Sequence, residues 1–307
     1  MKDKKNRLVA VIFAVLAVTC ATVGGVRWYK LRTSGQAYVD IQRDAASSAA
    51  QSDRQAGENK ASTDKAADEG KEAGASAVAP GKVVSSDEIP VDFETVQKEC
   101  PDAYAWIRIP GTQIDYPVCQ LVEGDQSFYL NHRADKVEEA AGAIYSENYN
   151  KRDFSDPVTV LYGHDMANGT MFQNLHFYED RAFFDKNREV QIYLPDRILH
   201  YRIFAAYNTN DDHLLLNNDC FRDPDVYYRF LQDILAQRSM SGFVDQNVQL
   251  TRDSRILTLS TCNAYDDQRY LVQCLLINPE TGETQATPAT AGMVTSQEGQ
   301  DGNGQGQ

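Results

Sequence analysis

Short apolar runs separated by turn residues fill the middle of the chain. Runs of four to ten residues rich in Val, Ile, Leu and aromatic side chains, bounded by Gly, Pro, Asn or Asp, are typical of β-strands. Such runs predict strands over residues 106–109, 114–118, 142–146, 158–162, 189–194, 199–207, 255–261 and 269–277. Apolar residues at helical spacing predict helices over residues 92–100, 169–176 and 224–239. Since strands and helices do not alternate regularly, the pattern favours a mainly β barrel decorated with helices.

A different pattern occupies the N-terminus, where residues 8–26 form a continuous apolar run without a charge. A helix of this length is about enough to cross a hydrocarbon layer of roughly 30 Å. We therefore expect a transmembrane helix that contacts membrane lipid. A cleaved signal peptide is the alternative, because Ala21 and Gly24 are small enough for cleavage, but the run is long for one. Basic residues lie on both sides of the run, so charge alone does not set its orientation.

The remaining segments divide by composition. Residues 33–88 are dominated by Ala, Ser, Gly, Asp, Glu and Lys, and this composition predicts a disordered or partly helical tether. Residues 280–307 are rich in Gly, Gln, Thr and Ala and predict a disordered tail. Residues 89–279 remain as one foldable domain, preceded by a start and membrane anchor over residues 1–32.

Charge and cysteine spacing exclude several classes of protein. The net charge of -14 argues against a nucleic-acid-binding protein, which needs a basic face for phosphates. The six cysteines form no CxxC pair and no zinc spacing. The sequence has neither a carboxylate cluster for calcium nor a glycine-rich phosphate loop. We predict no cofactor and no metal.

One cysteine stands at the end of a predicted strand. Residues 256–261 are mostly apolar or β-branched, and Cys262 follows them directly before a polar turn. A strand end is a rigid mount for a nucleophile, although a buried core cysteine is the more common case for this residue type. Arg269 opens the next strand, so a hairpin would place it beside Cys262, where a guanidinium could stabilise a thiolate or an oxyanion. A surface ion pair with Asp266 or Asp267 is the alternative for Arg269.

His164 has a similar setting, because it follows the buried-looking strand 158–162 and a glycine. Imidazole is a natural partner for a thiol, since it exchanges protons near neutral pH. His132 lies in a polar loop and is a lesser candidate. The alternatives are a turn residue for His164 and structural caps for the others, His132, His176, His200 and His213.

These segments together resemble a known family. Leu161-Tyr162-Gly163-His164, Thr258-Leu259-Ser260-Thr261-Cys262 and Arg269-Tyr270-Leu271-Val272 resemble the sortases, in which a histidine, a TLxTC cysteine and a downstream arginine form the active site. The flanking segments 106–112, 114–118, 128–132 and 169–172 are similar to class B sortases, as is a helix before the catalytic strand.

The resemblance implies an eight-stranded sortase-type β-barrel with His164, Cys262 and Arg269 as its active site. It implies cleavage of a sorting motif after threonine in secreted surface proteins, a thioester on Cys262, and transfer to a peptidoglycan-precursor or pilin amine. It also implies a single-pass anchor in the cell membrane with the domain outside. Two other functions remain open, a cysteine protease that releases its acyl group to water and a non-enzymatic anchored binding module.

Residues 278–282, Asn-Pro-Glu-Thr-Gly, themselves resemble an NPxTG sorting signal. A genuine signal would be followed by an apolar span and a basic tail, and neither is present. We therefore expect a turn that ends the last strand, with self-inhibition by this segment as a hypothesis.

Overall fold

The computed structural model describes residues 38–45, 82–83, 89–238, 242–262 and 268–282, and all structural statements below concern these residues. Among them, no helix is both long and apolar enough to cross a membrane. The predicted transmembrane helix over residues 8–26 lies outside the described residues, as does most of the predicted tail.

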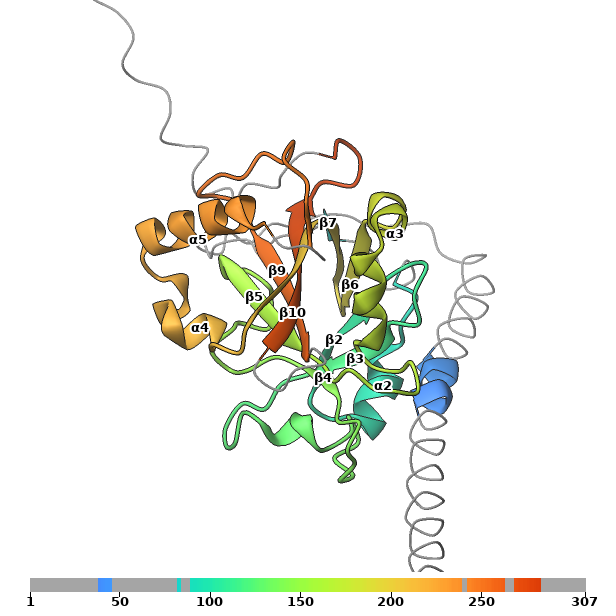
Figure 1. Cartoon of the computed structure of the whole chain (residues 1–307). Coiled ribbons are helices and arrows are strands. Elements are labelled where there is room, and N and C mark those ends of the chain that lie inside the picture. The colour runs from blue at the N-terminus through green and yellow to red at the C-terminus, as the bar shows by residue number, and fades with distance from the viewer. Residues whose placement is uncertain (1–37, 46–81, 84–88, 239–241, 263–267, 283–307) are drawn as a thin grey trace, which may run out of the picture.

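Eight strands close into a barrel (Figure 1). They are β2 (Ala103–Arg108), β3 (Asp115–Cys119), β4 (Ile144–Tyr145), β5 (Val158–Tyr162), β6 (Glu189–Leu194), β7 (Arg197–Asn210), β9 (Ile256–Cys262) and β10 (Gln268–Ile277). Their order is β7-β10-β9-β5-β4-β3-β2-β6, and β6 pairs back onto β7 to complete the ring. Two short strands, β1 (Lys82–Val83) and β8 (Phe243–Val244), add to β7. The prediction of an eight-stranded mainly β barrel is confirmed.

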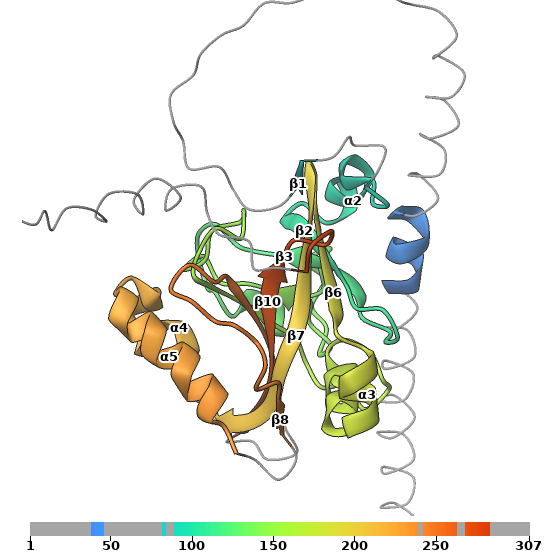
Figure 2. The same cartoon turned by 90° about the horizontal axis from the view of Figure 1, so that it is seen from above.

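Strand β9 is buried along almost its whole length because it is covered on both faces. Leu257 and Leu259 belong to the apolar cluster that fills the barrel. Ile256 belongs to a second cluster, which includes Leu231 and Ile234 of helix α5 (Pro224–Ala236). Figure 2 shows α5 beside the barrel wall, on the side opposite helix α3 (Arg181–Lys186). A strand buried on both faces loses the alternating exposure of a half-exposed one, and the buried Thr258 hydroxyl is satisfied by a hydrogen bond to Gln273.

The other helices are short. They are α2 (Phe93–Glu99), α4 (Leu214–Asn217) and the 3-10 helices η2 (Phe128–Leu130), η3 (Gln173–Glu179) and η4 (Asp219–Phe221). Asp223 caps α5 by accepting a hydrogen bond from the Asp225 N–H, and a proline occupies its first turn.

The helix predicted over residues 169–176 is wrong in its position. Gly169 and Met171 have φ values of +85° and +58°, in the left-handed region that no right-handed helix accommodates. The helical segment instead begins at Gln173, as η3, and α3 follows it.

Part of the segment predicted as a tether is ordered against the barrel. Residues 38–45 form a helix in which Tyr38 and Ile41 are buried. The Tyr38 hydroxyl donates a 2.6 Å hydrogen bond to the Gly142 carbonyl, and its ring packs edge-on against Tyr116. Tyr38 and Ile41 lie three residues apart and so share one helix face, which supplies the apolar contact that composition alone did not reveal.

Candidate active site

Cys262 is the last residue of β9, and its side chain is half-buried. Antiparallel pairing of β9 with β10 places Cys262 directly opposite Arg269. The two residues therefore lie at the same edge of the sheet, as expected from the hairpin that the sequence predicted.

His164 reaches this edge by a different route. Strand β5 runs parallel to β9, and Tyr162, its last residue, lies opposite Ser260. The next residue, Gly163, donates its N–H to the Ser260 carbonyl at 3.1 Å. His164 follows immediately, so the pairing of β5 with β9 brings it to the end of β9 that carries Cys262.

The His164 ring is held by a backbone carbonyl. Its Nε2 lies 2.6 Å from the Leu130 oxygen, which can only accept, so Nε2 carries the proton of this bond. In the neutral ring Nδ1 is then the nitrogen left to accept a proton. The ring bond described for His164 goes to Leu130 and not to the Cys262 thiol.

Gly163 has no room for a side chain. A Cβ at this position would lie 2.5 Å from Ile144 Cδ1 and 2.8 Å from Phe172 Cδ2. Contacts this short force the neighbours apart, so the end of β5 and the His164 ring beyond it would move.

We therefore expect Gly163→Ala to destabilise the fold by about 1–3 kcal/mol, a typical cost of overpacking. Peptide-cleaving activity should fall as well, because His164 is displaced. Thermal unfolding and steady-state kinetics measure the two effects. Adding Ile144→Val removes the closest clashing atom and should restore part of both; if the double variant is no better than Gly163→Ala, steric displacement is not the cause.

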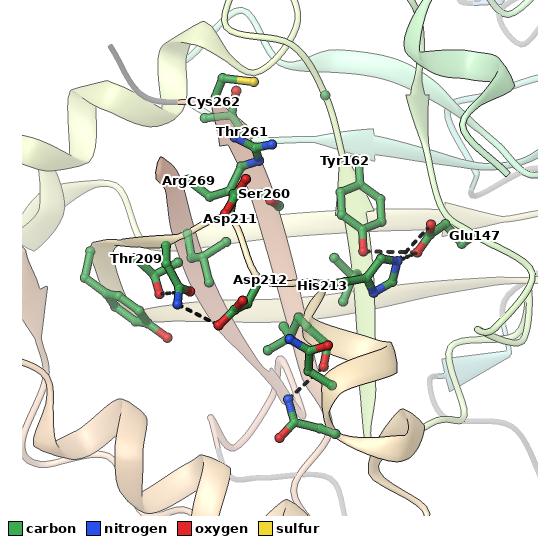
Figure 3. Close-up of a pocket in the computed structure, with 18 of the residues that line it drawn as sticks. Glu147, Tyr162, Thr209, Asp211, Asp212, His213, Ser260, Thr261, Cys262 and Arg269 are labelled. Atoms are coloured by element: carbon green, nitrogen blue, oxygen red, sulfur yellow. Dashed lines mark hydrogen bonds and ion pairs between the residues drawn. The ribbon is translucent and has the colours of Figure 1, made fainter. Parts of the chain in front are cut away.

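A pocket of about 660 Å³ lies between the outer barrel face and the α4–α5 segment. Val160, Tyr162, Tyr207, Leu271, Phe230 and Ile234 supply most of its apolar lining. His164, Cys262 and Arg269 all line it too, so the three predicted residues share one cavity. Figure 3 shows Cys262 and Arg269 on neighbouring strands, with Asp211 near Arg269 and Asp212 further along the pocket, where it accepts a hydrogen bond from Asn210. Pockets of this size, apolar with a few polar groups, are usual for ligand binding.

A polar cluster ties the pocket wall to the barrel (Figure 3). The Tyr162 hydroxyl donates to Glu147 Oε2 at 3.1 Å, and His213 Nε2 lies 2.9 Å from the same oxygen. His213 Nδ1 accepts a bond from the Leu216 N–H and so caps α4, as the sequence predicted for this histidine. Burial, followed by the Glu147 charge, raises the pKa of Tyr162, which keeps its hydroxyl a donor.

The remaining histidines have other surroundings. His132 stacks on Phe128 and does not line the pocket, so it is not a partner for the thiol. His200 lies on β7 beside Glu189. His176 contacts the backbone of Cys262 itself, with Nε2 3.1 Å from the carbonyl oxygen. No sequence signal marks this contact, because the two residues belong to different elements and are 86 positions apart.

The other described cysteines differ from Cys262. Burial raises the pKa of Cys100 to about 12 and holds the pKa values of Cys119 and Cys274 well above the ordinary range. These thiols stay protonated near neutral pH and are poor nucleophiles. Cys220 is partly exposed, and desolvation raises its pKa as well. Within the described segments, no group of three or more His, Cys, Asp or Glu side chains is arranged to hold a metal ion.

The segment that resembles a sorting signal lies at the far end of β10. Asn278 accepts the Gly282 N–H at 2.7 Å, which forms the predicted turn. The strand from Arg269 to Ile277 separates this turn from Cys262 by roughly 25 Å, at about 3.3 Å per residue. Residues 278–282 are therefore outside the pocket, and their described position gives no support to self-inhibition.

Comparison with known proteins agrees with this geometry. The sortase domain family matches residues 107–277. A sortase B of Listeria monocytogenes is 30% identical over 193 residues, covering 62% of this chain and 76% of the relative. The structure of sortase B from Clostridium perfringens is 30% identical, with a TM-score of 0.55, and covers 61% of this chain and 100% of its own. A class B sortase of Streptococcus pyogenes involved in pilus biogenesis is 28% identical, with a TM-score of 0.53, covering 60% of this chain and 97% of its own. The chain therefore belongs to the sortase family and is a cysteine transpeptidase with class B relatives.

Proposed function

We propose that Cys262 is the nucleophile of this transpeptidase, that His164 exchanges protons with the leaving and entering amines, and that Arg269 stabilises negative charge at the reacting carbonyl. The observation that supports these roles is the strand register. Parallel pairing of β5 with β9 and antiparallel pairing of β9 with β10 bring the three residues to one sheet edge, at one pocket.

The reaction proceeds by two acyl transfers. The Cys262 thiol gives its proton to His164 as its sulfur attacks the threonine carbonyl of a sorting motif, and the C–N bond breaks as His164 passes that proton to the departing amine. The acyl chain remains on Cys262 as a thioester. An acceptor amine then attacks the thioester and loses a proton to His164, the C–S bond breaks, and His164 returns the proton to the Cys262 sulfur. Arg269 balances the negative charge on the carbonyl oxygen during both attacks.

The pocket fits the amino-terminal part of an extended sorting peptide. Its apolar floor offers contact to side chains of the peptide, and the Tyr162, Glu147 and His213 cluster fixes the wall against which the peptide lies. The substrates are surface proteins that carry such a motif. The acceptor is an amine of a peptidoglycan precursor or of a pilin. The pilin alternative is supported by the similar class B sortase of S. pyogenes, which is involved in pilus biogenesis.

The apolar run at residues 8–26 supports anchoring of the enzyme in the cell membrane, with the barrel on the outer side where surface proteins arrive. A detergent-extraction and protease-accessibility assay on cells tests this. We expect extraction only with detergent and cleavage of the barrel by external protease; release by salt alone would contradict the anchor.

Mass spectrometry of the full chain tests the reaction. Incubation with a library of sorting peptides should add to the protein the mass of the peptide segment ending in threonine less one water, on the tryptic peptide that contains Cys262. Adding an amine should remove the adduct and produce the ligated peptide. Absence of any adduct across the library contradicts the proposal, and hydrolysed product without ligated product would favour the protease alternative.

A further inference from the structure

A contact between η3 and the strand of the nucleophile is not explained by the reaction above. His176 Nε2 lies 3.1 Å from the Cys262 carbonyl oxygen. The His176 ring also stacks on Tyr270, with centroids 4.9 Å apart, and Tyr270 is the residue next to Arg269. One histidine thus touches both strands that carry the proposed catalytic residues. Its side chain is only 17% exposed, so the contact is shielded from solvent.

The groups around His176 determine which protonation form of its ring can donate a hydrogen bond to each of them. His176 Nδ1 lies 2.9 Å from Glu179 Oε1, and Nε2 is also 3.7 Å from Asp165 Oδ2. The carbonyl and the carboxylates can only accept hydrogen bonds. A neutral imidazole has a single N–H and leaves one nitrogen lone pair facing an acceptor. The imidazolium ion donates from both nitrogens and therefore satisfies Cys262 and Glu179 together.

This contact bears directly on the thiol. β9 ends at Cys262, so its carbonyl is among the last polar groups of the strand. The carbonyl carbon and Cβ are bonded to the same Cα at nearly fixed angles, so anchoring the carbonyl also restricts the direction of the thiol.

We propose that His176, held by Glu179 and Asp165, is a positioning residue that anchors the backbone of Cys262 for attack. The inference rests on the proposed role of Cys262 as the nucleophile. His176 acts through Cys262 and does not touch the substrate. The titratable groups that face its ring are Asp165 after β5, Glu179 on η3, Tyr270 on β10 and Cys262 on β9.

Alkylation of Cys262 measures this role without any peptide substrate. All variants are made in a full chain that carries Cys220→Ser, because this substitution removes the other partly exposed thiol among the described residues. Modification of Cys262 by iodoacetamide is then followed by peptide mass spectrometry. His176→Ala should slow Cys262 alkylation and lower kcat for a cleaved sorting peptide by about 10- to 100-fold, with KM little changed, as for a small misplacement of a reacting group. His176→Gln supplies a neutral N–H donor and should restore most of the loss.

The ring hydrogen bond gives a second readout. Nitrogen NMR of histidine-labelled protein, with the His176 signal assigned by its absence in His176→Gln, should show a proton on Nε2, the nitrogen that faces the Cys262 carbonyl oxygen.

His200→Gln is the matched control, since His200 also lies beside a carboxylate but pairs with Ile277 at the opposite end of β10. The positioning role is contradicted if His176→Ala alkylates as fast as His200→Gln, or if His176 Nε2 carries no proton. Should His176→Ala fail to fold, the NMR signal of the unmodified chain still decides. A parent chain that cleaves no peptide would refute the proposed function, while alkylation and NMR would still test His176.

Discussion

Replacement of Cys262 by alanine is expected to abolish transpeptidation, with kcat/KM for a sorting peptide reduced by at least about 10⁴-fold, the usual scale for loss of a covalent nucleophile. No other described thiol can substitute. Cys100, Cys119 and Cys274 are buried with raised pKa values, and Cys220 lies on η4. Peptide binding should survive, because the apolar lining of the pocket is unchanged.

Peptide cleavage and fluorescence-based binding of the same peptide measure the two effects. Cys220→Ala is the matched control, since it removes a thiol of similar exposure and should retain activity. A Cys262→Ala chain with more than a small fraction of the parent activity would show that another group attacks the carbonyl. Equal losses in both variants would instead indicate a defect of folding.

Replacement of Arg269 by alanine is expected to lower kcat by about 10²- to 10³-fold, the range seen when one donor to a developing oxyanion is removed. The β9–β10 register places Arg269 opposite Cys262, and in the proposed role its guanidinium balances the negative charge that develops on the carbonyl oxygen. Arg269→Lys keeps the charge but loses the planar array of donors, so we expect a smaller reduction, of about tenfold.

The division between kcat and KM identifies what Arg269 does. A fall in kcat with KM unchanged indicates stabilisation of the transition state, whereas a rise in KM alone would show that Arg269 only binds the peptide. Arg222→Ala is the control, because Arg222 is a solvent-exposed arginine that does not line the pocket. Similar effects of Arg269→Ala and Arg222→Ala would contradict the proposed role.

Much of the barrel follows from local patterns. Each predicted strand run overlaps an observed strand, because short β-branched and aromatic runs between turn residues have few alternatives to pairing. The predicted strand bounds were less accurate where tertiary contacts set the length of the strand. The run at residues 142–146 forms only the two-residue β4, and the run at 199–207 extends to Arg197–Asn210 because β7 pairs along its length with β6 and β10.

The helical segments show where local reasoning failed. The apolar residues near Met171 suggested a helix, but positive φ values at Gly169 and Met171 turn the chain before η3 begins. The helix at residues 38–45 lies in the segment predicted as a disordered or partly helical tether, and its contacts with Gly142, Tyr116 and Asp115 hold it on the barrel. Composition averaged over the whole of residues 33–88 does not reveal that one short helix within them has an apolar face.

The sequence by itself determined the strands, the family and the candidates His164, Cys262 and Arg269, because strand periodicity and motif spacing are local properties of the chain. Only the tertiary structure decided that β5 pairs in parallel with β9, which brings His164 to the strand end that carries Cys262. It also decided the contact of His176 with the Cys262 carbonyl and the contact of Glu147 with His213. These contacts join residues far apart in the chain, and they form only when barrel closure gathers the ends of separate elements at one edge.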